Sequence, residues 1–475
     1  MKAIHGYWSV PALGMLLLIG CNTSGVTSND GGVTSVVYRA DQSTDTVEEL
    51  FSVSSGGRIN PQLALPKTVQ RFALTADLSS VIYIADQDAT SVYELYRVNL
   101  AAPGTSTKLS AAAITGGKDV QDFKLLPDGT GVVYLADQDT DGVNELYKVL
   151  FSSPGTSTRV NGTLTTGGNV LEFDVTANSG SVVYRADQDT DTVVELYRTI
   201  VSSGANSKLH SNYASGKSVS SFKLLPNSTG VVYTANQTSS SVTELYETVF
   251  GGGTGVTVSN TLATGGNVLD FVVSPDSASV VYRADQDTDG INELYRVALA
   301  SPTVSVKMNG GLISGGNVSA TYVVTPDSAS VVYIADEAVD EQFELYRTVF
   351  SGVTRTPLTS PRIGVGEDVY GVATIPDSSG VVYIADETSA GTRELYRVLF
   401  ATPATSTKLN PTLASGRVVE EAVVTSNSAS VLYRANQTSA AAVELYQVFF
   451  SSAGTSTTLN GNLITGGNVS AFAVR

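Results

Sequence analysis

Two short segments of the chain place carboxylates at alternate positions followed by a glycine. The pattern DxDxDGxxE occurs in Asp137, Asp139, Asp141 and Glu145, and again in Asp285, Asp287, Asp289 and Glu293. Alternating carboxylates can converge on one hard cation, and the glycine permits the tight backbone turn that this requires. These two segments therefore predict calcium sites.

A third segment carries an incomplete form of the same pattern. It keeps the carboxylates but replaces the glycine with Thr192, in Asp187, Asp189, Asp191 and Glu195. The spacing resembles the opening of an EF-hand loop, yet Lys148 stands where the first segment would need the twelfth-position glutamate. The closer resemblance is to the DxDxDGxxD calcium hairpin of integrin-type propellers. The alternative is that these acids are turn residues that bond their own backbone and hold no metal.

Residues for other chemistries are scarce. His210 is the one histidine outside the N-terminal segment, and we expect it in a solvated loop rather than in a Ser-His-Asp arrangement. Zinc sites lack cysteine and histidine ligands. Of the 22 tyrosines, most occupy two repeated positions, VxY and ELY, where we expect core packing between sheets. Apart from Tyr7 in the N-terminal segment, the tyrosines outside that pattern, and thus open to ligand contact, are Tyr93, Tyr213, Tyr322 and Tyr370. No catalytic residue is predicted, and the chain is not expected to be an enzyme.

The elements that must position these residues repeat along the chain. The motif VVYRAD…ELYRV recurs with its first valine at Val36, Val81, Val132, Val182, Val231, Val280, Val331, Val381 and Val431, a period near 50. One unit contains four β-rich runs, at 169–175, 181–187, 193–201 and 207–209, bounded by turn residues. Four short antiparallel strands in each of many repeats predict an all-β fold, a β-propeller over residues 36–475.

The two ends of this array complement each other. The first repeat lacks an inner strand before Val36, whereas 468–475 form a surplus strand after the last repeat. If the C-terminal strand completes the first repeat, nine whole blades close into a ring with no open edge. An eight-blade ring with one decayed unit and an open superhelix are the alternatives.

The repeats also resemble a known family. Ser274-Pro275-Asp276-Ser277 followed by VVYRAD, and Thr325-Pro326-Asp327-Ser328 followed by VVYIAD, look like the TolB-type branch of the WD-like propeller repeats. This resemblance covers residues 36–475 and implies the propeller fold. Propellers of this kind serve as docking platforms, envelope scaffolds and domains of enzymes, so the resemblance does not assign one function.

The N-terminal segment indicates where in the cell the protein is located. An apolar stretch from Val10 to Ile19 suits a signal peptide over 1–20, and Leu18-Ile19-Gly20-Cys21 resembles a bacterial lipobox. Cys21, the chain's one cysteine, would carry the lipid, and 21–35 would be a polar tether. Asn22 resembles the outer-membrane sorting preference of enteric-type bacteria. An ordinary secretory cleavage site with an incidental cysteine is the alternative.

Charge and repetition together set the expected function. With 28 basic and 45 acidic residues, the net charge of −17 argues against nucleic acid as a partner. We expect a lipid-anchored, non-catalytic cell-envelope propeller that binds another envelope or extracellular protein. The alternative is an envelope hydrolase or lyase with its site in the central channel. Unlike polar residues converging from adjacent inner strands would favour the enzyme, and repeated small or apolar residues would favour the scaffold.

Overall fold

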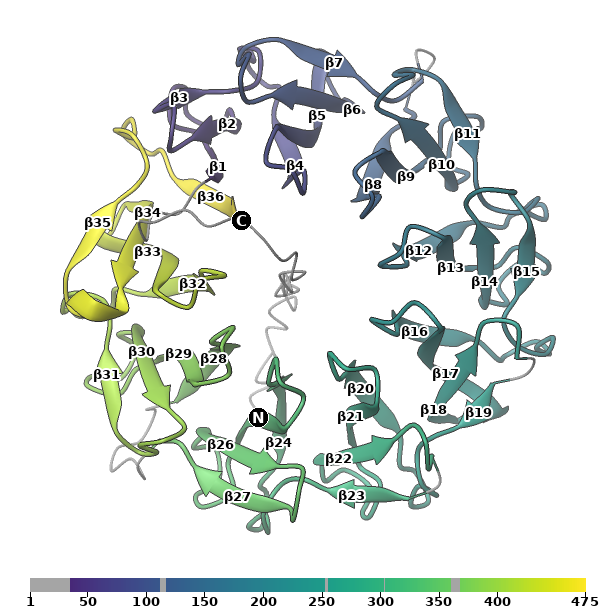
Figure 1. Cartoon of the computed structure of the whole chain (residues 1–475), viewed down its shortest axis with the longest axis vertical. Coiled ribbons are helices and arrows are strands. Elements are labelled where there is room, and N and C mark those ends of the chain that lie inside the picture. The colour runs from purple at the N-terminus through teal and green to yellow at the C-terminus, as the bar shows by residue number, and fades with distance from the viewer. Residues whose placement is uncertain (1–34, 112–116, 253–254, 303, 360–367) are drawn as a thin grey trace, which may run out of the picture. The chain divides into compact units, whose positions relative to one another are not determined.

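The computed structural model describes residues 35–111, 117–252, 255–302, 304–359 and 368–475. They form nine four-stranded antiparallel sheets, the blades, set around a ring. One edge strand of each blade lies nearest the centre, and in blade 1 this is the C-terminal strand β36 (Figure 1). The predicted signal peptide, Cys21 and most of the tether lie outside the described residues. Within the described part of the chain, no helix is long and apolar enough to cross a membrane.

The strands follow the repeats in order. The first three blades are blade 1 (β1 Val36–Ala40, β2 Glu49–Ser52, β3 Gly57–Arg58, β36 Val469–Val474), blade 2 (β4 Val69–Leu74, β5 Ser80–Ala89, β6 Val92–Asn99, β7 Ser106–Lys108) and blade 3 (β8 Val120–Leu125, β9 Gly131–Ala136, β10 Glu145–Leu150, β11 Ser157–Arg159). The next three are blade 4 (β12 Val170–Val175, β13 Ser181–Ala186, β14 Glu195–Ile200, β15 Asn206–Lys208), blade 5 (β16 Val219–Leu224, β17 Gly230–Ser239, β18 Val242–Val249, β19 Val256–Thr257) and blade 6 (β20 Val268–Val273, β21 Ser279–Ala284, β22 Glu293–Ala298, β23 Ser305–Lys307). The last three are blade 7 (β24 Val318–Val324, β25 Ser330–Ala335, β26 Glu344–Val349, β27 Thr354–Pro357), blade 8 (β28 Val369–Thr374, β29 Gly380–Ala385, β30 Glu394–Leu399, β31 Ser406–Lys408) and blade 9 (β32 Val419–Val424, β33 Ser430–Ser439, β34 Ala442–Phe449, β35 Ser456–Thr458), with a short 3-10 turn at Phe450–Ser452.

The C-terminal strand closes the ring. β36 pairs antiparallel with β1, with Val36 opposite Val474 and Tyr38 opposite Phe472. Blade 1 thereby gains the inner strand that its own repeat lacks, and the predicted nine-blade ring is confirmed. The alternatives of eight blades and of an open superhelix are wrong.

The core lies between neighbouring blades. Val37 and Leu50 of blade 1, for example, pack with Val81 and Tyr83 of blade 2 in one buried cluster. The corresponding cluster between blades 9 and 1 joins residues of β33 and β34 to residues of β1 and β2. Both faces of each sheet are therefore covered, which explains why the second strand of a blade reads as a continuous apolar run rather than an alternating one.

The third strand of blade 4 is shorter than the sequence suggests. We predicted it from residue 193, and it begins at Glu195. The N–H of Val193 closes a turn onto the carbonyl of Thr190, and the carbonyl of Val194 accepts from the N–H of Val219 in blade 5. These two residues thus serve the turn and the next blade instead of the hairpin ladder.

The turns between the first and second strands of a blade are hydrogen-bonded to the corresponding turns of neighbouring blades. Ser277 has a φ of 60° and its hydroxyl accepts a 3.0 Å hydrogen bond from the N–H of Asn227 in blade 5. Ser328 accepts in the same way from Asp276 of blade 6 at 3.0 Å. The Pro-Asp-Ser turns that carry the family resemblance therefore also hold adjacent blades in register.

Candidate functional site

The first acidic position of each hairpin ties three pieces of backbone together. Asp137 accepts hydrogen bonds from the N–H of Asp119 at 2.5 Å and from the N–H of Gly142 at 3.1 Å. The first bond anchors the connector that precedes the inner strand, and the second closes the hairpin's own turn. All nine blades keep a bond from this side chain to the connector, through Asp41, Asp86, Asp137, Asp187, Asn236, Asp285, Asp336, Asp386 and Asn436. The bond to the hairpin's own turn, which we considered for this position, is formed by the side chains of Asp41, Asp86, Asp137, Asp187, Asn236, Asp285, Asp336 and Asp386.

The third acidic position meets a cation of the outer strand. In blade 6, Asp287 lies 2.8 Å from the Lys307 ammonium, which also lies 2.6 Å from Glu293. The hydrogen bond from Lys307 lowers the pKa of Asp287. Lys208 binds Asp189 and Glu195 of blade 4 in the same way, at 2.8 Å and 2.6 Å. Burial opposes the charge of Lys208, but these two ion pairs outweigh it and raise its pKa.

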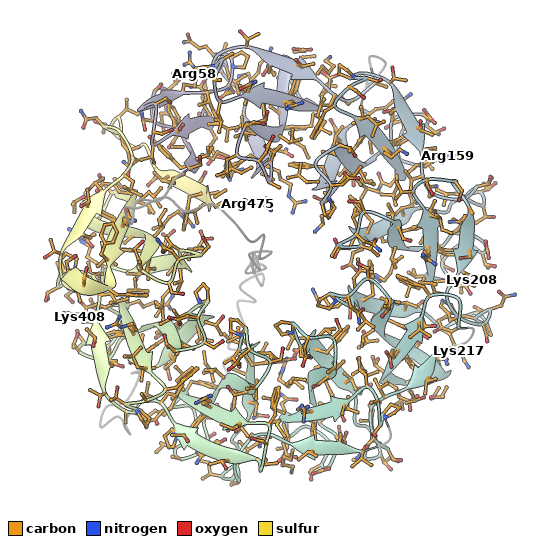
Figure 2. The ribbon with its side chains drawn as sticks, in the orientation of Figure 1. Arg58, Arg159, Lys208, Lys217, Lys408 and Arg475 are labelled. Atoms are coloured by element: carbon orange, nitrogen blue, oxygen red, sulfur yellow. The ribbon has the colours of Figure 1, made fainter. Side chains whose placement is uncertain are left out.

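The lysines and arginines of the outermost strands, which pair with these carboxylates, lie along the outer rim of the ring. Figure 2 labels four of them, from the outermost strands of blades 1, 3, 4 and 8: Arg58, Arg159, Lys208 and Lys408. Blade 3 differs from blades 4 and 6, because its outer strand offers Arg159, which pairs with Glu145 at 3.1 Å. Asp139 forms no ion pair with any described residue.

The fifth acidic position packs against the glycine-rich connector. The Asp289 carboxylate lies 2.7 Å from where a Cβ on Gly265 would stand, and Gly265 has a φ of 95°. Asp141 approaches Gly117 in the same way in blade 3, with 3.4 Å between the corresponding points. In blades 3 and 6 the acidic hairpin therefore lies against the glycine-rich connector that leads into the same blade.

These contacts bear on the predicted calcium sites. In blade 6 the carboxylates of Asp285, Asp287 and Asp289 face backbone N–H groups, a lysine and a connector, respectively. No group of three or more His, Cys, Asp and Glu side chains within the described residues is arranged to hold a metal ion. Calcium binding in blade 6 would require Lys307 to leave both of its carboxylates. Calcium therefore stays a prediction. In blade 3 the Asp139 carboxylate has no ion pair to any described residue, while the Lys118 ammonium donates to the Asp139 carbonyl at 3.1 Å.

The glutamate before Leu-Tyr or Leu-Phe is structural in a way that the sequence did not show. We expected it to bond its own hairpin. In blade 4, Glu195 accepts from the Tyr197 hydroxyl of its own hairpin at 2.9 Å and also from the N–H of Tyr213 in the following connector at 2.9 Å. Glu394 of blade 8 accepts from the connector N–H of Leu413 at 3.0 Å. In blades 1, 4 and 8 the glutamate thus links its own strand to the connector that leads into the next blade.

The repeated tyrosines form stacked pairs inside each blade. Tyr184 and Tyr197 face each other across β13 and β14 with ring centroids 5.5 Å apart, and the other eight pairs are alike. Burial raises the pKa of Tyr184 to about 12, although bonds to its hydroxyl from Gly162 and Asn206 oppose the shift. The predicted core role is confirmed, with the rings also contacting each other across strands.

The four tyrosines outside the pattern have different surroundings. Tyr322 is buried and its hydroxyl donates to Asp270 at 2.7 Å, while Tyr213 stacks on His210 with centroids 4.1 Å apart. Tyr93 is partly buried against the cluster between blades 2 and 3. Tyr370 remains 37% exposed, beneath the guanidinium of Arg393 at 3.8 Å. Of these four, Tyr370 has the largest surface for ligand contact.

His210 is buried, so the expectation of a solvated loop histidine was wrong. Its Nε2 accepts from the N–H of Leu196 at 3.0 Å, and its Nδ1 lies 2.6 Å from the Ser211 carbonyl, to which it donates in the neutral form. Burial lowers its pKa. In the other eight blades the N–H of the equivalent leucine donates to a side-chain oxygen. The acceptors are Asn60, Ser110, Asn161, Ser259, Asn309, Thr359, Asn410 and Asn460. The sequence contained this signal, because His210 aligns with short polar residues in every other copy.

The inner strands carry unlike residues from blade to blade. Their exposed second positions include Gln70, Gln121, Leu171, Ser220, Leu269, Tyr370 and Glu420. Of the acids at the third position, Glu172 pairs with Arg185 at 2.9 Å and Asp270 with Arg283 at 2.5 Å within their own blades, whereas Asp122 of blade 3 pairs with Arg71 of blade 2. The inner strands thus differ in residue type from blade to blade, as expected of an enzyme, but their third-position acids are already engaged in ion pairs.

Neither a family model nor a curated protein matches the chain. Solved structures do match, at low identity. One titled as a eukaryotic initiation factor is 9% identical with a TM-score of 0.58, and the match covers 92% of this chain and 98% of that one. The dipeptidyl peptidase 4 of Porphyromonas gingivalis is 12% identical with a TM-score of 0.55, covering 81% of this chain and 59% of that one. A putative TolB from Agrobacterium tumefaciens is a further neighbour, 16% identical over 54% of this chain and 84% of that one, with a TM-score of 0.33. The first two likenesses show the propeller fold and do not assign an activity.

Proposed function

We propose that this protein is a lipid-anchored propeller of the bacterial cell envelope, in the outer membrane, that binds another envelope or extracellular protein without catalysis. The observation that supports the proposal is the use of its repeated polar residues. The hairpin acids and the glutamate before Leu-Tyr or Leu-Phe hold strands, connectors and neighbouring blades. The repeated tyrosines are buried pairs. What varies between blades is the exposed surface of inner strands and loops, where a rigid scaffold carries its binding residues.

Capture from an envelope extract tests the proposal. The chain with Cys21→Ser is immobilised as bait, and retained proteins are compared with those on a heat-unfolded sample of the same bait. The proposal predicts a protein retained in fixed stoichiometry and recovered with unchanged mass. A retained molecule that leaves the bait cleaved or chemically altered would instead favour the hydrolase or lyase.

Calcium at the acidic hairpins belongs to the same proposal as a stabiliser of the hairpin face. Asp139 supports it in blade 3, since no described lysine competes for that carboxylate. Open loops with few carboxylates bind calcium with dissociation constants of about 0.1 to 1 mM. Its test is the melting measurement given in the Discussion.

A further inference from the structure

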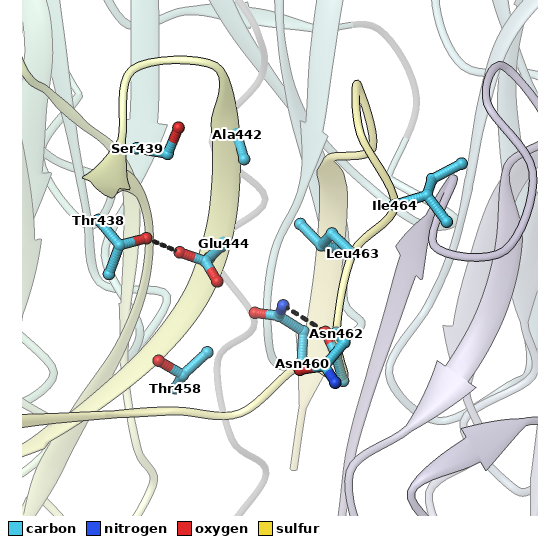
Figure 3. A pocket seen from close by; sticks show the side chains of 10 residues that line it. Thr438, Ser439, Ala442, Glu444, Thr458, Asn460, Asn462, Leu463 and Ile464 are labelled. Atoms are coloured by element: carbon cyan, nitrogen blue, oxygen red, sulfur yellow. Dashed lines mark hydrogen bonds between the residues drawn. The ribbon is translucent and has the colours of Figure 1, made fainter.

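Blade 9 contains a pocket at the position where blades 2, 4, 6 and 8 hold a lysine. The cavity has a volume of about 510 Å³, and its lining includes Thr438, Glu444, Thr458, Asn462 and Ile464 (Figure 3). It lies beside the connector that leads from blade 9 to β36 in blade 1. Figure 3 shows the Glu444 carboxylate with one oxygen bonded to Thr438 and the other turned away from it.

Blade 8 shows what the same position holds when it is filled. Lys408, opposite Tyr396 in the β30–β31 register, places its ammonium 3.2 Å from Glu394 and 2.9 Å from the Thr412 hydroxyl. Thr388 donates to the other oxygen of Glu394 at 3.0 Å. One carboxylate, one neutral oxygen and a threonine behind the carboxylate are therefore enough to hold an ammonium group in this fold.

Blade 9 repeats that arrangement without the lysine. Thr458 stands opposite Tyr446 in the β34–β35 register, where blade 8 has Lys408. Glu444 takes the place of Glu394, and Thr438 donates to it as Thr388 does in blade 8.

The neutral ligand is kept as well. Asn462 occupies the position of Asn212 in blade 4, whose side-chain oxygen accepts from the Lys208 ammonium at 2.8 Å. Glu444 is only partly buried, whereas Glu394 and Glu195, which face lysines, are buried. The substitution of Thr458 for lysine thus removes the cation and leaves its ligands facing a cavity.

We propose that this pocket binds a primary ammonium group presented from outside the chain, as on a lysine side chain or a free alkylamine. Glu444 supplies the charge and Asn462 a neutral acceptor, while Leu463, next to Asn462 in the lining, contacts the methylene stem. The net charge of −17 favours the approach of such a cation. If the ammonium belongs to a lysine of a polypeptide, this pocket is one contact with the partner protein of the proposed function, and the inference then rests on that function. If the ammonium belongs to a free amine, the inference does not depend on the proposed function.

A methyl NMR titration tests the site without any partner protein. The full chain is labelled on isoleucine methyl groups, the Ile464 signal is assigned with Ile464→Val, and N-acetyl-lysine methylamide is added. The matched probe is N-acetyl-norleucine methylamide, which has the same stem without the ammonium. We expect a saturable shift of Ile464 with the lysine probe and none with the norleucine probe.

Two variants address the residues. Glu444→Gln keeps the shape of the pocket and should weaken binding about tenfold or more. The reason is that a hydrogen bond to a charged group contributes more free energy than one between neutral groups, by an amount that corresponds to about a tenfold change in the dissociation constant. Thr458→Lys restores the ion pair of blade 8 and should abolish the shift by filling the site. A wild-type Ile464 that does not saturate, or an equal response to the norleucine probe or in Glu444→Gln, would overturn the proposal.

Butylammonium separates the two sources. An equal response to butylammonium and to the lysine probe indicates recognition of the ammonium alone, as for a free amine. A response to the lysine probe alone indicates a polypeptide lysine. Both results support an ammonium site, and both remain readable if envelope capture finds no protein partner.

Discussion

Replacement of His210 by asparagine should change how stability depends on pH. The neutral imidazole accepts from the buried N–H of Leu196 at 3.0 Å while Nδ1 donates to the Ser211 carbonyl. Protonation puts a hydrogen on Nε2 and removes that acceptor. A buried N–H left without a partner costs about 1–3 kcal/mol. Asparagine at this position, as in five other blades, accepts the same bond and does not titrate.

The sign follows from the direction of the pKa shift. Burial lowers the pKa of folded His210, and the carbonyl of Ser211 and the charge of Glu195 only partly oppose it. Unfolded histidine takes up a proton near pH 6.5. Above that pH the contribution to stability is fully present. As the pH falls through 6.5 toward the folded pKa, the free energy of unfolding decreases by up to about 1.4 kcal/mol per pH unit from this group.

Urea unfolding at pH 7.5 and pH 5.0, followed by circular dichroism, measures the effect. Carboxylates also titrate toward acid pH, so the informative quantity is the difference between wild type and His210→Asn. We expect the variant to lose about 1 kcal/mol less than wild type between the two pH values. Equal losses in both proteins would refute the role assigned to His210.

Three further predictions concern the anchor, calcium and the connector glycines. Cys21→Ser should move the protein out of the membrane fraction without changing its melting temperature, and retention with membranes after a salt wash would contradict the lipobox. Millimolar calcium, but not magnesium, should raise stability by about 1 kcal/mol per occupied hairpin, measured as a melting shift that Asp139→Ala plus Asp287→Ala reduces. A melting curve that calcium does not change would contradict calcium binding and show that the acidic hairpins act only as turns. Gly265→Ala should destabilise more than Gly290→Ala, because both have a positive φ but only the first meets a carboxylate, Asp289 at 2.7 Å. Equal urea midpoints for the two variants would show that the contact has no cost.

The fold was predictable because the chain presents nine copies of one unit. The period, the four strands of a blade and the closing role of 468–475 follow from comparing copies, and the structure has all three. Strand ends were less predictable. Val193 and Val194 continue the apolar run of their strand, yet their backbone groups bond a turn and the neighbouring blade.

The acidic hairpins show where prediction from a pattern ends. Asp285, Asp287 and Asp289 share a spacing that suits one cation, but three-dimensional contacts separate them. The partner of Asp287 is Lys307, 20 positions later on an outer strand of three residues, too short to reveal its register in sequence. The pocket in blade 9 was missed for the same reason, since Thr458 has meaning only once Lys408 is seen to face Glu394.

The proposed scaffold depends on a closed ring of nine blades, and an engineered disulfide tests closure most directly. Val36 and Val474 are opposite residues of β1 and β36, and opposite residues of an antiparallel pair lie within the Cα separation that a disulfide spans. In a Cys21→Ser background, Val36→Cys with Val474→Cys should form an intrachain bond under mild oxidation, seen as a monomer whose two terminal peptides are joined in mass spectrometry. The single-cysteine variants are the controls. Free thiols or disulfide-linked dimers alone would contradict the ring.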